Sequence, residues 1–196
     1  MTERIASLRR KTGETDISMT LNLDGSGTSE IKTGIGFFDH MLNSFARHGF
    51  FDLKLDVDGD LDVDCHHTIE DTGIVLGEAI KKALGDKRGI RRFGSFILPM
   101  DDVLVLVAMD LSGRPYFCYD VALTTPKVGD FDTEMVREFF YAVSYSAGMN
   151  LHIKLLSGEN NHHIIEGIFK AFAKALDEAS SMDARIQDVL STKGAL

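Results

Sequence analysis

Cysteine and proline are scarce in this chain of 196 residues, which has two cysteines, Cys65 and Cys118, and three prolines. Two cysteines cannot form a disulfide framework, and the prolines mark no linker between domains. No apolar run approaches the roughly 20 residues that a membrane-spanning helix needs. Residues 1–10 lack the apolar core of a signal peptide. We therefore expect a soluble, cytoplasmic protein with no membrane partner.

Positive charge is also limited, because 21 Lys and Arg stand against 30 Asp and Glu, for a net charge of −9. This balance argues against a nucleic-acid partner, since phosphate backbones bind to a basic face. A small phosphorylated substrate is still compatible, because it needs only a few well-placed Arg or Lys side chains. Hydrophobic content of 44% is ordinary for a globular protein large enough to bury a substantial core.

The chain is organised as two copies of one pattern: three strands, a helix, a strand and a second helix. In the first copy we expect strands near 4–11, 16–23, 27–33 and 51–57, and helices near 37–47 and 66–84. In the second copy we expect strands near 91–99, 103–110, 115–121 and 149–156, and helices near 133–147 and 162–179. These elements predict an α/β protein of the α+β type. Its internally duplicated half-domains, 1–88 and 89–180, would each form a small four-stranded sheet with two helices, packed as a helix/sheet sandwich.

Both copies carry one short motif, HHTIE at 66–70 and HHIIE at 162–166, and the two motifs begin 96 residues apart. On a helix the glutamate shares a face with residues three or four positions before it, so either histidine can share a metal ion with it. Neighbouring residues point about 100° apart, so the two histidines of one pair should serve different ions. The motifs predict two metal sites, each drawing on both copies.

The ligand types narrow the choice of metal. Imidazole with carboxylate suits Mn, Fe, Zn or Ni. Cys65 precedes the first motif, but Asn161 precedes the second, so we expect no thiolate ligand. The motifs supply three ligands per ion, and His40 and His152 could each add a fourth, although either could be only a surface or capping histidine. Four ligands on an octahedral ion leave two open positions, as in catalytic sites.

Other polar residues are candidates for binding an anion. These are Arg88, Arg91, Arg92, Arg114 in the turn SGRP at 112–115, and Lys193 in STKG at 191–194. Such residues on loops often bind anions, although a plain hairpin, solvated side chains and a disordered tail would also account for them. Glu14 lies in a polar run between strands and could be simply exposed.

Several of these motifs occur together in a known family. They are RKTGET at 10–15, GFFDHML at 36–42, HHTIED at 66–71, SGRP at 112–115, NHH at 161–163 with Glu166 and FKA at 169–171, and STKG at 191–194. In this order and over nearly the whole chain, the sequence resembles the imidazoleglycerol-phosphate dehydratase family in its monofunctional form. The fused form also carries a phosphatase domain, for which we expect no room in 196 residues.

The resemblance implies a lyase of histidine biosynthesis that removes water from D-erythro-imidazole glycerol phosphate to give imidazole acetol phosphate. It implies two Mn²⁺ per active site, which favour the deprotonated imidazole of the substrate. The hydroxyl next to the ring can then leave, through an imidazolate/diazafulvene intermediate. Glu14 would be the acid/base that removes the adjacent carbon-bound proton.

The resemblance also assigns ligands. One Mn²⁺ would take His40, His67, Glu70 and His162, and the other His66, His152, His163 and Glu166. Phosphate binding would fall to His48, Arg92, Arg114, Ser191 and Lys193, with 181–196 as a C-terminal substrate-binding tail. The family builds its sites between the chains of a 24-subunit homo-oligomer. Departures from the family pattern occur at Ser44, Cys65 and Leu190, none of them a metal ligand.

Two rival functions remain to be weighed. A two-metal hydrolase could also use paired ions, but it would need carboxylates that bridge the metals, and the motifs here are dominated by histidine. A metal-storage or metal-templated assembly protein would leave Glu14, Arg92, Arg114 and Lys193 without a shared purpose.

Overall fold

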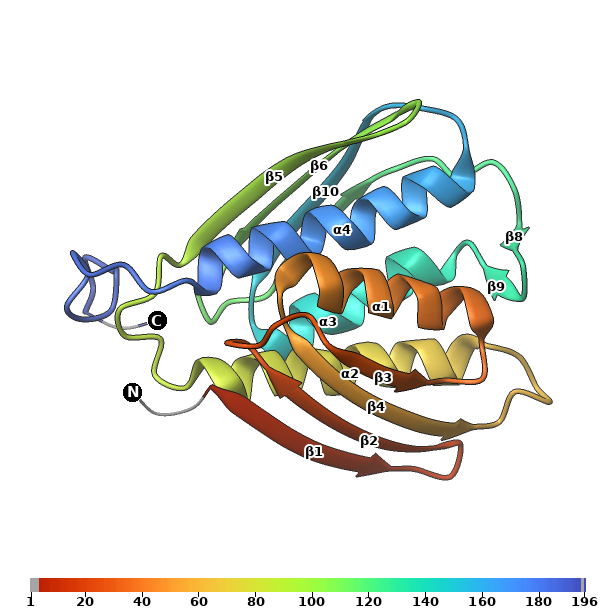
Figure 1. Cartoon of the computed structure of the whole chain (residues 1–196), viewed down its shortest axis with the longest axis horizontal. Coiled ribbons are helices and arrows are strands. Elements are labelled where there is room, and N and C mark those ends of the chain that lie inside the picture. Colours follow the sequence, from red (N-terminus) through yellow and green to blue (C-terminus); the bar gives the residue numbers. More distant parts are fainter. Residues whose placement is uncertain (1–3, 195) are drawn as a thin grey trace.

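The computed structural model describes residues 4–194 and 196, so residues 1–3 of the expected first half and residue 195 of the tail lie outside the described residues. The first half forms β1 (Ile5–Lys11), β2 (Thr15–Asn22), β3 (Ser29–Lys32), α1 (Gly36–Gly49), β4 (Asp52–Gly59) and α2 (His66–Leu84). The second half forms β5 (Phe93–Met100), β6 (Val103–Asp110), β7 (Tyr116–Asp120), α3 (Met135–Ala147), β10 (Asn150–Ser157) and α4 (Asn161–Ser180). The expected order of strands and helices is confirmed (Figure 1).

The two sheets have one topology. Their strand orders are β1-β2-β4-β3 and β5-β6-β10-β7, each with antiparallel pairs except for one parallel pair at the edge, β3 with β4 and β7 with β10. In the central strands apolar side chains alternate with exposed ones, as expected for a sheet with a single buried face. The α/β architecture with duplicated half-domains is thus confirmed, while the boundary at residue 88 stays a prediction.

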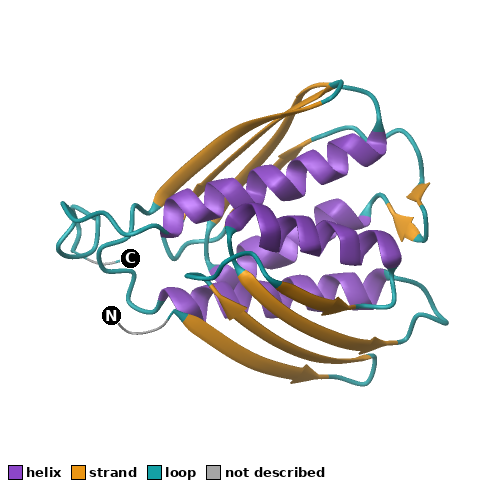
Figure 2. Ribbon diagram, viewed as in Figure 1, coloured by secondary structure: helices purple, strands orange, loops and turns teal. Residues whose placement is uncertain are grey.

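The four helices lie between the two sheets (Figure 2). Helix α1 packs beside α4, where the rings of Phe45 and Phe172 stack with centroids 5.7 Å apart. Helices α2 and α3 approach even more closely: a methyl group added at Gly73 would meet the carbonyl of Phe139, and one at Gly77 the carbonyl of Val143. The order of these contacts shows that α2 and α3 run in the same direction.

One element was not expected from the sequence, a short ribbon of β8 (Lys127–Val128) and β9 (Phe131–Asp132). It forms because Phe131 is fully buried against the rings of Phe37 and Phe38. The ribbon therefore closes the end of the helical layer at which α1 begins. Among the described residues, no helix has the length and apolarity needed to cross a membrane.

Candidate active site

Both histidine pairs occupy the first turn of a helix, because the preceding residues cap it. Asp64 accepts a hydrogen bond from the backbone N–H of His66 at 2.7 Å, and Asn160 accepts one from the backbone N–H of His163 at 3.2 Å. Such side-chain oxygens satisfy N–H groups that have no partner within the helix. The pairs are thus held at the helix starts, with their rings free to point outward.

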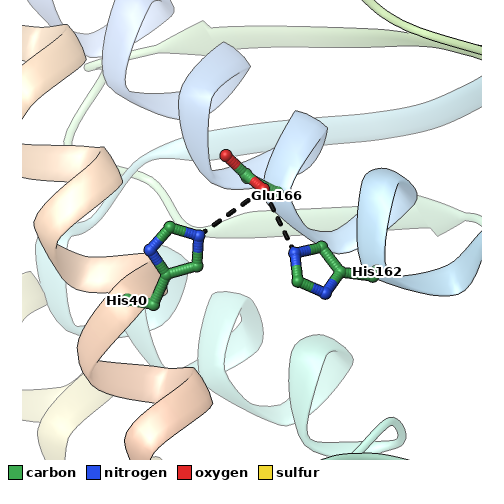
Figure 3. A group of neighbouring side chains, drawn as sticks. All are labelled: His40, His162 and Glu166. Atoms are coloured by element: carbon green, nitrogen blue, oxygen red, sulfur yellow. Dashed lines mark ion pairs between the residues drawn. The ribbon is translucent and has the colours of Figure 1, made fainter.

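His40, His162 and Glu166 form a triad that brings α1 and α4 together (Figure 3). The Oε2 atom of Glu166 lies 3.3 Å from Nε2 of His162 and 3.6 Å from Nε2 of His40. Within the described part of the chain this is the one group of three such side chains whose ligand atoms all lie within 4.8 Å of one another. Both imidazoles are about half exposed, whereas Glu166 is buried.

Lys170 orients the carboxylate of Glu166 toward the two imidazoles. Its Nζ lies 2.7 Å from Oε1 of Glu166, one helical turn away, so the other carboxylate oxygen faces the imidazoles. Burial raises the pKa of Glu166, but the hydrogen bond and charge of Lys170, followed by His40 and His162, outweigh this effect and hold the pKa below its ordinary value. Glu166 is therefore an ionised carboxylate, the form that can bind a cation.

The first motif has the same local geometry. Oε2 of Glu70 lies 3.6 Å from Nε2 of His66, four residues before it. The resemblance groups Glu166 with His66, His152 and His163; within one chain Glu166 lies with His40 and His162, and Glu70 lies with His66, and the assignment of ligands to ions stays a prediction. The reason for the grouping within one chain is that both glutamates share a helix face with the residue four positions earlier, the first histidine of each pair.

The second histidine of each pair is held from two sides by carboxylates. Asp60 lies 2.9 Å from Nδ1 of His67, and Glu14 lies 3.7 Å from its Nε2. The hydrogen bond that the ring of His67 donates to Asp60 raises the pKa of His67; burial lowers this pKa less, and the charge of Glu14 raises it further. A carboxylate on Nδ1 fixes the ring so that Nε2 is the atom free to bind.

The same pattern recurs at His163 with carboxylates from other positions. Asp102 lies 2.8 Å from Nδ1 of His163, and Asp101 lies 3.7 Å from its Nε2. Both acids come from the β5–β6 turn. Asp102 also accepts the backbone N–H groups of Glu159 and Asn160, and these hydrogen bonds hold its pKa well below the usual range.

Internal duplication reveals a residue that the sequence analysis missed. The buried Phe38, Met41, Leu42 and Phe45 of α1 and the buried Val136, Phe139, Phe140 and Val143 of α3 match one to one, each pair 98 positions apart. The same offset places Glu138 where α1 has His40. Glu138 lies beside Phe139, which packs against α2 one turn after Glu70. The repeated apolar pattern could have identified Glu138 from the sequence.

His152 lies apart from these groups. On β10 its neighbours Leu151 and Ile153 are fully buried toward the helices, so the side chain of His152 points to the opposite face, where its ring lies 5.6 Å from that of Tyr116. Within one chain, therefore, His152 is not brought to His163. Its role as a ligand stays a prediction.

Four of the five expected phosphate-binding residues, Arg92, Arg114, Ser191 and Lys193, lie at the other end of the molecule. The guanidinium of Arg92 pairs with Asp110 at 2.7 Å and donates to the carbonyl of Leu190 at 2.7 Å, which ties the C-terminal tail to the start of β5. An open pocket of about 550 Å³ is lined by Arg92 and by residues 185–192, including Ser191. The Ser112-Gly113-Arg114 turn lies against the terminal Leu196, and Lys193 donates its backbone N–H to Ser191.

This pocket is far from the triad of the same chain. The backbone N–H of Arg92 bonds to the carbonyl of Ala179, at the end of α4, whereas His162 lies at its start. A rise of about 1.5 Å per residue puts about 25 Å between them. His48 lies between the two ends; burial lowers its pKa, and the charges of Lys170 and Lys174 lower it further.

The departures at Cys65, Leu190 and Ser44 do not alter the triad. Cys65 is buried, its Sγ donates to Asp132 at 3.3 Å, and burial raises the pKa of its thiol. Leu190 contributes its backbone carbonyl to Arg92, and Ser44 is buried in α1.

Comparison with known proteins identifies the family. The sequence model described as imidazoleglycerol-phosphate dehydratase matches residues 33–176. The chain belongs to the imidazoleglycerol-phosphate dehydratase family. It is 70% identical to the imidazoleglycerol-phosphate dehydratase of Lachnoclostridium phytofermentans over 97% of each chain, and 55% identical to that of Geobacter sulfurreducens over 98% of this chain and 99% of the relative. As a member of this family, the chain is an enzyme of the hydro-lyase class.

Solved structures of the family have the same fold. The imidazoleglycerol-phosphate dehydratase of Staphylococcus aureus matches with a TM-score of 0.83 and 40% identity, covering 91% of this chain and 99% of that chain. That of Pyrococcus furiosus, described as a complex with (S)-C348, matches with a TM-score of 0.84 and 41% identity, covering 96% of this chain and 100% of that chain. The two-sheet architecture is therefore the family fold.

Proposed function

We propose that this enzyme removes water from D-erythro-imidazole glycerol phosphate to give imidazole acetol phosphate, a step of histidine biosynthesis, with two Mn²⁺ per active site. The observation that carries this proposal is the triad of His40, His162 and Glu166 on α1 and α4, together with its counterpart His66 and Glu70 on α2 beside α3. Two related ligand groups in one chain suit a substrate whose ring has two nitrogen atoms.

The triad has the chemistry of a divalent metal site. Two imidazoles and one carboxylate face one another with their ligand atoms within 4.8 Å, and Mn²⁺ accepts such a mixed set. The first ion would be held by His40, His162 and Glu166, with His67 of a neighbouring subunit as the fourth ligand. The second would be held by His66, Glu70 and His163, with Glu138 proposed in place of His152. When bound, the ions would stabilise the deprotonated imidazole of the substrate.

Glu14 is proposed as the general base. Its carboxylate lies on the Nε2 side of His67 and its side chain is 55% exposed, so a substrate can reach it. In the reaction the hydroxyl next to the ring would leave as hydroxide and become water with the proton that the ring nitrogen gave up. Glu14 would accept the proton from the neighbouring carbon and return it to the ring. The resulting enol becomes the ketone product, so the atoms of one water molecule are removed overall.

Arg92, Arg114, Ser191 and Lys193 are proposed to bind the phosphate, with His48 adding a hydrogen bond. Charge-assisted contacts of this kind can hold a dianion on an acidic protein. Because Arg92 lies about 25 Å from His162 along α4, one small substrate cannot span both within one chain. We therefore propose that active sites form between chains of a 24-subunit assembly. Native mass measured with and without Mn²⁺ tests this part; a monomer at all metal concentrations would contradict it.

The function is tested by incubating the Mn²⁺-loaded protein with imidazole glycerol phosphate and following imidazole acetol phosphate by its absorbance or by mass spectrometry. We expect turnover that disappears with a chelator and returns when Mn²⁺ is restored. Absence of product at millimolar substrate, from protein shown to contain its metal, would reject the proposal. His66→Ala is a matched control, since it removes a ligand and leaves the phosphate-binding residues intact.

A further inference from the structure

Glu14 projects from a turn that is closed by its own residues. The hydroxyl of Thr12 accepts the backbone N–H groups of Glu14 at 3.1 Å and Thr15 at 2.9 Å, and the N–H of Thr12 donates to the carbonyl of Thr15 at 2.8 Å. These bonds fix the shape of the turn. They do not fix where it lies relative to α2, on which His67 is carried.

A buried polar contact joins the β1–β2 turn to α2. The hydroxyl of Thr15 donates to Oδ2 of Asp71 at 2.6 Å, and the guanidinium of Arg10 donates to Oδ1 of Asp71 at 3.1 Å. Asp71 follows the ligand Glu70 directly in α2. Thr15 and Asp71 are 4% and 7% exposed, so water competes little for this bond and it holds the strand to the helix firmly. Thr15 is also the residue next to Glu14.

The second half shows that packing alone does not require this contact. At the corresponding places, the first residue of β6 is Val103 and the residue after Glu166 is Gly167. A methyl group at Gly167 would lie in ordinary contact with Val103, 3.6 Å away, so this junction is apolar. Strand and helix thus pack without a hydrogen bond there, and the turn is instead tied through Asp102 to the residues before α4.

We propose that Asp71 is a positioning residue for catalysis, which acts through the Thr15 hydroxyl to hold Glu14 over His67. This inference rests on the proposed role of Glu14 as the general base. Among the described residues the carboxylate of Glu14 forms one ion pair, with His67 at 3.7 Å, so its place is set largely by the backbone of the turn. A displacement of about 1 Å in a reacting group can cost on the order of 100-fold in rate.

The test removes the hydroxyl of Thr15 and keeps the volume of its side chain. Thr15→Val should lower kcat by about 10- to 100-fold, change KM by less than about twofold because no substrate contact is lost, and leave the Mn²⁺ content unchanged. Thr15→Ser restores the hydroxyl and should recover most of the turnover. Hydrogen exchange of a peptide covering residues 10–16 should speed up in Thr15→Val and return toward wild type in Thr15→Ser.

Thr72→Val is the matched control. Thr72 is fully buried in the same helix, and its hydroxyl donates to the carbonyl of Thr68 at 2.6 Å without touching the turn. It should lower the melting temperature about as much as Thr15→Val and leave kcat unchanged. If both variants lose turnover equally, or if Thr15→Val keeps wild-type kcat, the positioning role is wrong.

A double-mutant cycle separates this proposal from the one on which it rests. In a Glu14→Gln background, Thr15→Val should cause no further loss of the residual rate, because the group that it positions is gone. A full further loss would show that Asp71 and Thr15 act on something other than Glu14. Absence of turnover in the wild-type enzyme would reject the proposed function itself, and the positioning role with it.

Discussion

The two halves of the chain surround their second histidine in the same way but draw the carboxylates from different elements. His67 is held on Nδ1 by Asp60, which follows β4, and faces Glu14 from the β1–β2 turn. His163 is held on Nδ1 by Asp102 and faces Asp101, both from the β5–β6 turn. Because Asp60 takes over the orienting bond in the first half, the single acid of that turn is left free for chemistry.

The surroundings of the glutamate also differ between the two motifs. In the second motif Lys170 neutralises one oxygen of Glu166, and His40 completes a closed triad. In the first motif Ile74 occupies the place of Lys170, the side chain of Glu70 is 45% exposed, and a glutamate, Glu138, stands in place of His40. The duplication has thus kept the frame of the two proposed metal sites, while their charge and preorganisation have diverged.

The largest effect on kcat should come from the β1–β2 turn, which carries Glu14. Glu14→Gln removes the proposed base without changing its size, so kcat should fall by roughly 10²- to 10⁴-fold. Metal content and native mass should stay at wild-type values, because Glu14 is not a proposed ligand. Steady-state kinetics with metal analysis of the same sample provides the measurement. Loss of metal together with turnover would make Glu14 a ligand or a structural residue.

Exchanging the residues at positions 40 and 138 tests the divergence of the two sites. Glu138→Ala should lower the affinity for one of the two metal ions. The loss should exceed the roughly 10- to 100-fold that is typical of removing a residue that only hydrogen-bonds to a ligand. Glu138→His should retain that metal and shift the preference from Mn²⁺ toward Zn²⁺ or Ni²⁺, since imidazole favours the later metals. Metal titrations monitored by calorimetry give both results. His40→Glu is the reciprocal variant, and unchanged metal binding in Glu138→Ala would remove Glu138 from the ligand set.

Asp60→Asn and Asp102→Asn should have effects similar to each other, because each carboxylate holds the Nδ1 atom of one histidine. We expect the Mn²⁺ affinity to fall by about 10- to 100-fold in each variant. At saturating Mn²⁺ the turnover should recover to within a few-fold of wild type. A variant that binds Mn²⁺ normally would show that its carboxylate does not set the orientation of the imidazole.

The smallest effect concerns the first residues of β4 and β10, Asp52 and Asn150. The hydroxyl and backbone N–H of Thr28 and the N–H of Ser26 bond to Asp52 and hold its pKa well below the usual range. Its contribution to stability is therefore present above the unfolded pKa of about 3.9 and is lost as the pH falls below it. Asp52→Asn should cost on the order of 1 kcal/mol at neutral pH and less at pH 3.

Denaturant unfolding at the two pH values measures this difference. Asn150 donates to the carbonyl of Arg114 and cannot titrate, so Asn150→Ala should cost the same at both pH values. An Asp52→Asn cost that stays constant between neutral pH and pH 3 would contradict the assignment.

Much of this arrangement could be predicted from local patterns. The alternating strand expected at 51–57 is β4, and the repeated order of strands and helices gave the duplicated fold. The choice between the two histidines of each pair could not be predicted, because helical spacing allows the glutamate to face either one. Within one chain the four-residue spacing brings each glutamate to the first histidine of its pair, and the packing of α1 against α4 adds His40 to the second motif.

Two further points, the untested role of His152 and the unexpected β8–β9 ribbon, have different causes. Ligand counting favoured His152, although it stands between the strongly apolar Leu151 and Ile153, and this alternation already indicates a side chain on the outer face of the sheet. The short β8–β9 ribbon depends on Phe131 finding the rings of Phe37 and Phe38, a contact between distant parts of the sequence. Two-residue strands carry too little local pattern to reveal it.

The contact between Lys170 and Glu166 bears on whether folding or metal binding comes first. The carboxylate already has a cationic neighbour, so the triad can persist in a newly folded chain that has not met its metal. An arriving ion then finds its binding oxygen oriented, and it competes with a single ammonium group rather than having to organise a loop. Folding can therefore precede metallation, and in the proposed assembly the supply of metal would set when folded subunits associate.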